Sequence, residues 1–385
     1  MMNIENVIIL GAGASKSEGA PLQNELFKEF YKQVLKDKEW SLSKKQEDLI
    51  IDYFKKFWGI DIKNYQNRDI KFPTFEECLG VLDLAYYRGE SFKGYPKGKI
   101  EKIRNALIFL IAKVLDKKLQ GKITHHKKLV DRPKGKKEND KENNEEKSSL
   151  RQTAFLSLNY DIIIDNVLVD LYQEDKEYHL DYGIDFINFE RKNDWKRNDW
   201  KRPDKNKAVL LLKIHGSLNW LYCPTCNHIE LTPKEKGAIK AFYKGFYEVK
   251  KCNECGTPME PVIISPTYYK EMTNPFIQKV FLKADKVLRS AKRIFICGYS
   301  FPDADLHIKY LLKRAEQFRG ESPEIYVINN HRNKTEQQKE EEKQRISRFF
   351  KNKEKIHYTN LSFENFAETG IKELVKKYEQ AIPSQ

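Results

Sequence analysis

Two Cys-x-x-Cys pairs are the strongest chemical signal in this sequence of 385 residues. Cys223 and Cys226 form the first pair, and Cys252 and Cys255 form the second. Thiolates at this spacing can bind one tetrahedral zinc ion, and four cysteine ligands leave no open coordination position. We therefore predict a structural zinc site, with unpaired buried thiols as the alternative. The nearby His228 is expected at the surface and not as a further ligand.

Polar residues that could do chemistry follow two short apolar stretches. Asn159 and Asp161 follow residues 154–158, and His215 follows residues 208–212. Parallel strands end at one edge of a sheet, where α/β proteins bind ligands. A histidine has a pKa near neutrality and suits general-base work. The competing interpretations are a hydrogen-bonded histidine at a strand end and a simple Asn-Tyr-Asp turn.

A glycine-rich turn lies near the N-terminus. The apolar residues 7–10 predict a buried strand, and Gly11-Ala12-Gly13 and then Ser15 follow it. Glycines at this position let the backbone approach a pyrophosphate, and the next helix offers free N–H groups. The turn lacks the third glycine of the common GxGxxG spacing, and glycine-rich turns also occur for packing alone. Nucleotide binding and packing are both open interpretations of this motif.

The elements that must position these residues are short apolar strands that alternate with helices. A helix is expected around residues 22–35, and the chain is expected to be largely helical from there to about residue 120, with helical spacing of apolar residues over 103–114. Another helix is expected near residues 305–318. Such alternation predicts an α/β fold with a Rossmann-like parallel sheet covered on both faces. The predicted strands are residues 7–10, 154–158, 208–212, 262–264, 293–296 and 324–328.

The net charge of +14 raises the question of nucleic-acid binding. Lysine far outnumbers arginine, whereas base and phosphate recognition draws on arginine. Much of the charge lies in mixed-sign runs at residues 134–147 and 334–348, which are typical of solvated linkers or helix faces. We therefore do not expect direct nucleic-acid binding as the primary role.

No targeting or membrane segment is evident. No run of about 18 apolar residues exists, and the first residues lack the pattern of a signal peptide. Cysteines in Cys-x-x-Cys pairs without a secretion signal favour metal ligation over disulfides. We expect a cytoplasmic protein without a membrane span.

Taken in order along the chain, these motifs resemble those of the sirtuins. Residues 157–161 resemble the sirtuin TQNID segment, and His215-Gly216 matches the catalytic HG dipeptide, which a four-cysteine module follows in both cases. The late turn at residues 298–300 resembles the GTS turn, and Asn329 resembles a ribose-contacting asparagine. The residues in register with the sirtuin opening pattern GAG(I/V)SxxSGIPDFR are Gly11, Ala12, Gly13, Ser15, Gly19 and Pro21.

The sequence also departs from the sirtuin pattern. Residues 22–24 replace the Asp-Phe-Arg of the opening loop, Leu158 replaces the glutamine of TQNID, and residues 264–268 replace a Phe-Gly-Glu pattern. Residues that handle the acyl-lysine peptide are among those missing, and most of those that handle NAD remain. This combination is similar to the bacterial sirtuin-like branch in anti-phage defence, in which the domain acts as an NAD hydrolase. The run at residues 298–305 also looks like that branch.

The resemblance implies cleavage of NAD to nicotinamide and ADP-ribose, with NAD as substrate and zinc as a structural ion. Asn159 would position water or the ribose, Asp161 the carboxamide, and His215 would accept a proton. Control by a homo-oligomer or by a partner ATPase of the HerA type is expected by analogy. The alternatives are an NAD-dependent protein deacylase and a non-catalytic scaffold or nucleic-acid-binding subunit. The implied NAD-binding residues are Gly11, Ala12, Gly13, Ser15, Gly298, Ser300 and Asn329.

The sirtuin resemblance also predicts a domain organisation with two insertions. One insertion is helical, one binds zinc, and a flexible linker follows the helical insertion because its composition shifts to Lys, Glu and Asn. The predicted segments are the Rossmann-like domain at 1–30, 151–220 and 262–385, the helical insertion at 31–124, the linker at 125–150 and the zinc-binding module at 221–261.

Overall fold

The computed structural model describes residues 3–34, 42–62, 70–130, 150–174, 178–187, 204, 207–232, 250–264, 274–302, 305–331 and 334–380. The chain forms two compact units, each with buried apolar side chains of its own. Unit 1 comprises Met1–Glu18, Lys122–Ile214 and Met272–Gln385, and unit 2 comprises Gly19–Gly121 and His215–Glu271.

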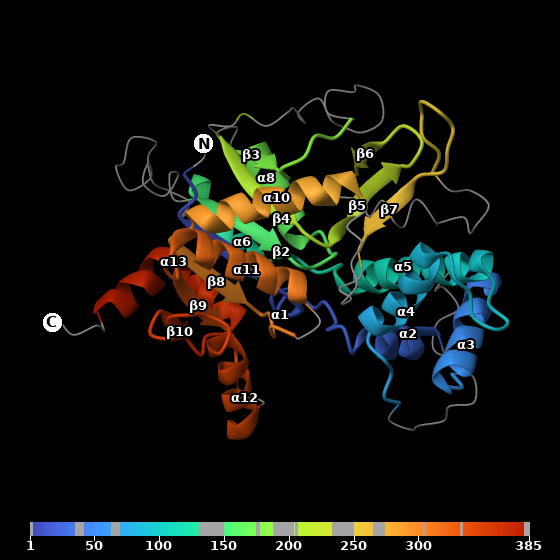
Figure 1. Cartoon of the computed structure of the whole chain (residues 1–385), viewed down its shortest axis with the longest axis horizontal. Helices are drawn as coiled ribbons and strands as arrows, with labels where there is room; N and C mark the ends of the chain where they lie inside the picture. Colours follow the sequence, from blue (N-terminus) through green and yellow to red (C-terminus); the bar gives the residue numbers. More distant parts are fainter. Residues whose placement is uncertain are drawn as a thin grey trace. The chain divides into compact units, whose positions relative to one another are not determined.

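Unit 1 is built on a seven-stranded parallel sheet with the strand order β10-β9-β8-β1-β2-β4-β3 (Figure 1). All residues of β1, β2 and β4 are buried, because helices cover both faces of the sheet. The α/β fold with a Rossmann-like parallel sheet is thereby confirmed. The strands are β1 (Asn6–Leu10), β2 (Thr153–Ser157), β3 (His179–Asp181), β4 (Ala208–Lys213), β8 (Arg293–Cys297), β9 (Glu324–Ile328) and β10 (Ile356–Tyr358).

The helices of unit 1 form a layer on each face of this sheet (Figure 1). Helices α10 (Pro275–Ser290) and α11 (Leu306–Arg319) pack together on one face. Helix α6 (His125–Val130) packs between α8 (Ile163–Glu174) and α13 (Phe363–Gln380) on the other. Right-handed crossovers explain this division, because the chain moves from β1 toward β4 and later from β8 toward β10. Two more helices are α1 (Ala12–Lys16) and α12 (Glu336–Ser347).

Unit 2 contains a helical part with an aromatic core. Its helices are α2 (Leu26–Val34), α3 (Lys44–Trp58), α4 (Phe75–Arg88) and α5 (Lys97–Lys118). Ser43 and Thr74 begin α3 and α4 with capping boxes, which satisfy backbone N–H groups that a helix leaves unpaired. The rings of Phe27 and Phe54 meet edge to face at 4.8 Å in the core.

Unit 2 also contains a three-stranded antiparallel sheet with the order β6-β5-β7. Its strands are β5 (Gly216–Cys223), β6 (His228–Leu231) and β7 (Glu260–Ile263). The strand predicted at residues 262–264 therefore exists as β7, but it lies in this small sheet and not in the parallel one. An apolar run predicts a strand without naming its partner, and here the partner is β5.

The predicted linker at residues 125–150 begins with helix α6, and residues 131–149 lie outside the described residues. The helix starts here because both oxygens of the Glu18 carboxylate accept hydrogen bonds from backbone N–H groups of residues 124–126. This contact joins residues more than one hundred positions apart and leaves no trace in local composition.

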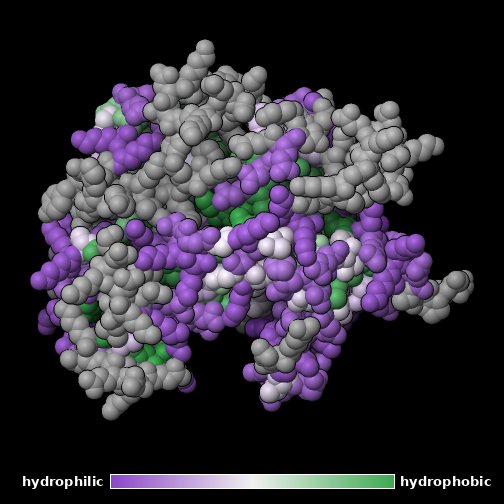
Figure 2. Space-filling model, turned by 180° about the vertical axis from the view of Figure 1, so that it is seen from behind, coloured by the Kyte–Doolittle hydropathy of each residue, from purple (hydrophilic) through white to green (hydrophobic). Residues whose placement is uncertain are grey.

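The surface of the described residues is largely hydrophilic on the face seen in Figure 2. Most of the run at residues 334–348 forms α12, which exposes Glu336, Glu340 and Glu341. No helix among the described residues is both long enough and apolar enough to cross a membrane.

Candidate functional site

Three strands of the parallel sheet end side by side at its carboxyl edge. Leu10 at the end of β1 pairs with Ser157 of β2 on one side and with Cys297 of β8 on the other. The strand order reverses between β1 and β8, since the chain first builds the sheet on one side of β1 and later on the other. In open α/β sheets a reversal of this kind marks the crevice where ligands bind.

The turns after β1 and β8 pack against each other through three glycines. A Cβ atom on Gly11 would lie 2.7 Å from the carbonyl oxygen of Gly298, and one on Gly13 would lie 2.8 Å from the Gly298 Cα. Gly298 has φ +59°, and a Cβ atom there would lie 2.3 Å from the nitrogen of Ala14. Two backbone hydrogen bonds join the turns, from Gly11 N to Cys297 O and from Gly13 N to Gly298 O. Packing therefore explains why these positions require glycine, and nucleotide binding at the turn stays a prediction.

Ser15, Asn159 and Asp161, which we call the Ser15 cluster, meet at this edge. The Asn159 Nδ2 donates to Gly11 O at 2.9 Å and to Ser15 Oγ at 2.8 Å. Ser15 Oγ in turn donates to Asp161 Oδ2 at 2.7 Å. Ser15 and Asp161 are buried, whereas Asn159 is half-buried. The structure thus brings together three residues that the sequence predicted for the site.

The hydrogen bonds of the Ser15 cluster fix the orientation of the Asn159 amide. Gly11 O is a carbonyl and can only accept, so the amide nitrogen must face it. Ser15 uses its single proton on Asp161, so its oxygen must accept from Asn159. Both N–H groups of the amide are therefore engaged, and Asn159 Oδ1 remains as an acceptor for a ligand.

Asp161 is engaged within the protein through both carboxylate oxygens. Asp161 Oδ1 accepts from the backbone N–H of Ile163 at 3.1 Å, near the start of α8, and Oδ2 accepts from Ser15. The geometry gives Asp161 a positioning role in the cluster. Its predicted contact with a carboxamide stays a prediction.

His215 opens the second stretch of unit 2, two residues after the end of β4. Its side chain is buried, and its backbone carbonyl accepts from Ile264 N at 3.0 Å. Gly216 follows with φ +78°, where a Cβ atom would lie 1.9 Å from Val262 O. The glycine of the His-Gly pair is therefore required for β5 and β7 to approach each other.

The other predicted NAD-binding residues lie after β8 and β9 in unit 1. Ser300 is exposed in the loop after β8. Asn329 follows β9 directly, and its Nδ2 donates to the buried carboxylate of Glu342, which also accepts from Lys334. The amide of Asn329 is thus held by α12 at the carboxyl edge of the sheet.

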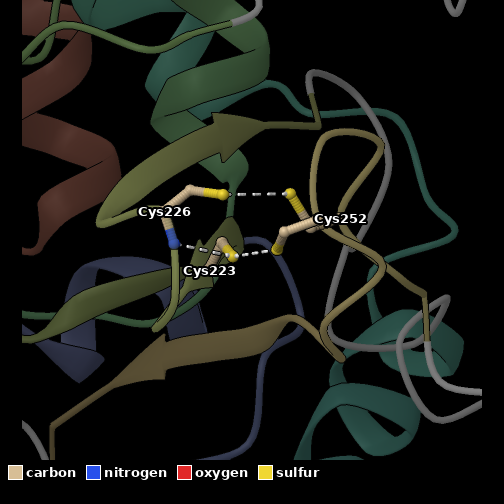
Figure 3. A group of neighbouring side chains, drawn as sticks. Cys223, Cys226 and Cys252 are labelled. Carbon is tan, nitrogen blue, oxygen red and sulfur yellow. Dashed lines mark hydrogen bonds between the residues drawn. The ribbon is translucent and has the colours of Figure 1, made fainter.

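The four predicted zinc ligands converge in unit 2 between the ends of β5, β6 and β7, and Figure 3 labels three of them, Cys223, Cys226 and Cys252. All four sulfur atoms lie within 4.8 Å of one another. Cys223 Sγ is 3.5 Å from Cys255 Sγ, and Cys226 Sγ is 3.9 Å from Cys252 Sγ. Four sulfurs about 2.3 Å from one tetrahedral ion would be about 3.8 Å apart, whereas a disulfide requires about 2.05 Å. The cluster fits a structural zinc ion.

Two thiols of this cluster have pKa values that are shifted in opposite directions. Hydrogen bonds with Thr257 lower the pKa of Cys255 to about 6, whereas the adjacent Cys255 sulfur and burial raise that of Cys226. Four thiols this close cannot all ionise without a cation between them, so zinc would displace their protons on binding.

His228 corrects one expectation about this module. The residue is buried and its Nε2 lies 3.5 Å from Cys252 Sγ, so it is not a surface residue. A histidine beside a ligand sulfur can support it by hydrogen bonding without being a ligand itself. Burial of this kind depends on a contact with a residue 24 positions away in the sequence.

The sequence did not predict the residues that contact the backbone of the Ser15 cluster and the start of α8. Lys213, at the end of β4, is fully buried and contacts both Asp161 and Asp165, and Tyr182 contacts Asp165. The signal available in the sequence was a lysine at the end of the apolar run 208–212. A charged residue there is unusual, because its ammonium must find a partner inside the protein.

Several Sir2 structures show a distant likeness to this chain. A triple mutant of a Sir2 homologue in complex with 2'-O-acetyl-ADP-ribose is 14% identical with a TM-score of 0.39, and 99% of this chain and 94% of that chain are covered. A Sir2 homologue in complex with NAD is 13% identical with a TM-score of 0.38, covering 98% and 90%. A structure concerning the mechanism and regulation of Sir2 enzymes is 12% identical with a TM-score of 0.36, covering 74% and 82%.

Comparison with curated proteins found no significant match. The family model described as the SIR2-like domain matches residues 153–358. This range runs from β2 to β10 and includes Asn159, Asp161, His215 and the four cysteines of the cluster. Because the match extends over more than half of the sequence, this chain belongs to the SIR2-like domain family.

Proposed function

We propose that this protein hydrolyses NAD to nicotinamide and ADP-ribose. Membership of the SIR2-like family implies an NAD-dependent activity. The observation that supports hydrolysis most directly is the fixed orientation of the Asn159 amide, which leaves a carbonyl oxygen as acceptor at the carboxyl edge of the sheet.

Hydrolysis requires a water molecule held with a lone pair toward the ribose carbon that nicotinamide leaves. Departure of nicotinamide gives an oxocarbenium-like ribose, as in other glycosyl transfers. An acceptor that receives a hydrogen bond from one O–H of the water holds this lone pair in the required direction. Asn159 Oδ1 is such an acceptor, and it can equally accept from a ribose hydroxyl during binding.

The remaining residues have supporting roles in this proposal. His215 accepts the proton, either from water or through a ribose hydroxyl. Ser15 and Asp161 hold the Asn159 amide. Gly298 and Ser300 would lie along the dinucleotide after β8, and Asn329 would contact the adenosine ribose after β9.

Departures from the sirtuin pattern favour hydrolysis over deacylation. Residues 22–24 and 264–268 replace segments that in sirtuins include residues handling the acyl-lysine peptide. Leu158 replaces a polar residue and is buried beside Asn159. Without an acyl-lysine oxygen to attack the ribose, water is the nucleophile that remains.

Zinc in this proposal is structural. Cys223, Cys226, Cys252 and Cys255 would hold it in unit 2, and its contribution there is to join the turn between β5 and β6 to the segment before β7. Four thiolate ligands leave no position for a substrate.

We also propose that the activity is regulated and serves bacterial anti-phage defence through depletion of NAD. The support is the sirtuin resemblance of the sequence together with the cost of uncontrolled NAD loss to a cell. On the same analogy, a homo-oligomer or a partner ATPase of the HerA type would supply the control.

Product analysis tests the proposed reaction. Purified protein, separated by size into monomeric and oligomeric fractions, is incubated with NAD with and without an acetylated peptide, and all products are identified by mass. Hydrolysis gives nicotinamide and ADP-ribose in either case, whereas O-acetyl-ADP-ribose forms only in deacylation. Asn159→Ala should abolish the products, and Asn365→Ala, exposed on α13, should leave them unchanged. NAD that stays intact in every fraction, both alone and with a partner ATPase of the HerA type present, would contradict the proposal.

A further inference from the structure

Lys213 is a fully buried lysine at the carboxyl end of β4. Its relative exposure is 0%, and it pairs in register with Ser157 of the neighbouring strand β2. Its Nζ donates to Asp165 Oδ2 at 2.9 Å and to the backbone carbonyl of Asp161. Asp165 is also buried, and its Oδ1 accepts from Tyr182 Oη at 2.7 Å. The ammonium thus joins β4 to the first turn of α8.

Stability alone does not account for this ion pair. Moving two charges out of water carries a large desolvation penalty, and apolar residues of similar volume are often as stable in such places. β4 is otherwise apolar up to this residue, so a hydrophobic side chain would continue the core. A role in fixing geometry explains a lysine here better than packing does.

The bond to the Asp161 carbonyl points to what Lys213 fixes. Asp161 and Asn159 belong to the short turn between β2 and α8, and Asp161 holds Ser15, which holds the Asn159 amide. The Lys213 ammonium contacts the backbone of this turn at the Asp161 carbonyl, and the side chains of Asn159 and Asp161 in the turn belong to the Ser15 cluster. A shift of the Asp161 backbone would therefore displace the acceptor oxygen of Asn159.

We propose that Lys213, neutralised by Asp165, is a positioning residue that sets the orientation of the Asn159 amide. Its effect on turnover rests on the proposed NAD hydrolysis, whereas its effect on the Asn159 geometry does not. The ammonium acts through the Asp161 carbonyl and touches no reacting atom.

The test separates geometry from stability with two variants. Lys213→Met removes the ammonium but leaves the buried carboxylate of Asp165 without this partner, so the melting temperature should fall by roughly 5–10 °C. The double variant Lys213→Met/Asp165→Asn removes both charges and should recover much of that loss. Neither variant restores a donor to the Asp161 carbonyl.

The readout is the NMR signal of the Asn159 side-chain amide in protein labelled with ¹⁵N at asparagine. The signal is identified by its loss in Asn159→Ala. In both variants we expect the two amide proton shifts to move toward those of an exposed asparagine, and kcat to fall about 10- to 100-fold while NAD affinity is retained. Lys313→Met serves as the matched control, because it breaks a 2.6 Å ion pair between lysine and a buried glutamate, Glu316, on α11 and outside the Ser15 cluster. Its Asn159 signal and kcat should match the wild type.

A folded double variant with unchanged Asn159 shifts would overturn the positioning role. The positioning role would also be contradicted if the double variant were as unstable as Lys213→Met and its Asn159 signal changed only when the protein unfolds. A wild-type protein that leaves NAD intact in every fraction, alone and with a partner ATPase of the HerA type, would refute the hydrolase proposal, and the Asn159 shifts would still decide the role of Lys213.

Discussion

Ser15 Oγ and Asp161 Oδ2 share a hydrogen bond of 2.7 Å across 146 positions of sequence. The bond joins helix α1, which follows β1, to the turn after β2, and its direction determines how Ser15 meets Asn159. Because the Ser15 proton is used on Asp161, the serine oxygen accepts from the Asn159 amide. One serine hydroxyl thus decides which atom of Asn159 is available to a ligand.

Ser15→Ala should therefore reduce NAD turnover strongly with a modest loss of stability. Asn159 would lose one of its two acceptors and Asp161 one donor, and misplacement of a positioning group can cost about 10²-fold in rate. The control is Ser17→Ala on the same turn, whose hydroxyl donates only to Ala14 O. Steady-state NAD consumption and thermal melting give the two readouts. Equal turnover in both variants would be inconsistent with the proposed orientation of Asn159.

His215→Ala should abolish turnover while the fold and zinc content stay intact. Loss of a general base typically costs about 10²- to 10⁴-fold. His357→Ala provides the comparison, because His357 lies on the edge strand β10 and pairs with Glu324 of β9. The assay requires a preparation in which the wild type consumes NAD. Unchanged consumption in His215→Ala would show that another group accepts the proton.

Zinc should be present at about one ion per chain, and its removal should unfold the module before it alters chemistry. Cys223→Ser and Cys252→Ser should each lower zinc content and the melting temperature. Cys78→Ala should retain zinc, because Cys78 lies on α4 and outside the cluster. Elemental analysis of protein purified without chelators measures the content. Protein free of zinc under those conditions, yet as stable as the metal-loaded form, would rule out the assignment.

Gly298→Ala should be far more damaging than the same change at another glycine with positive φ. Both Gly298 and Gly320 have a left-handed backbone, which costs an alanine about 1–2 kcal/mol. At Gly298 the methyl group would also lie 2.3 Å from Ala14 N, whereas nothing lies within 4 Å of a Cβ atom on Gly320. We expect Gly320→Ala to fold with a small loss of stability and Gly298→Ala to fold poorly. Similar denaturation midpoints for the two would contradict the packed turns.

Glu18 should make stability depend on pH in the acid range. Burial alone would raise the pKa of Glu18, but hydrogen bonds with the His126 side chain and with the backbone N–H groups of residues 124 and 126 lower it to about 2. A lowered folded pKa stabilises the protein above the ordinary value of 4.5, and this contribution is lost as pH falls from about 4.5 toward 2.

Glu18→Gln should accordingly lower the free energy of unfolding at pH 7 by about 2 kcal/mol and flatten its decline in acid. Urea unfolding between pH 7 and pH 3 measures both effects. Glu373→Gln, exposed on α13, is the control. A variant whose unfolding free energy follows that of the wild type throughout this range would exclude the Glu18 contribution.

Much of unit 1 could be predicted because its information is local. The apolar runs at residues 7–10, 154–158, 208–212, 293–296 and 324–328 became strands of the parallel sheet, since a strand buried on both faces must be apolar throughout. The four zinc ligands could also be predicted from the two Cys-x-x-Cys pairs, because ligand spacing is a property of the sequence itself. The short strands β3 and β10 were not predicted, because three residues are too few to show a hydrophobic pattern.

What only the tertiary structure decided is how side chains distant in sequence meet. The partner of β7, the burial of His228 and the carboxylate cap on α6 all arise from contacts across long stretches of chain. The same holds at the site, where the sequence identified Asn159, Ser15 and Asp161 but neither the hydrogen bonds among them nor the lysine that contacts Asp161. Periodicity and composition report which residues are buried, whereas hydrogen-bond direction depends on which buried groups the fold brings within 3 Å.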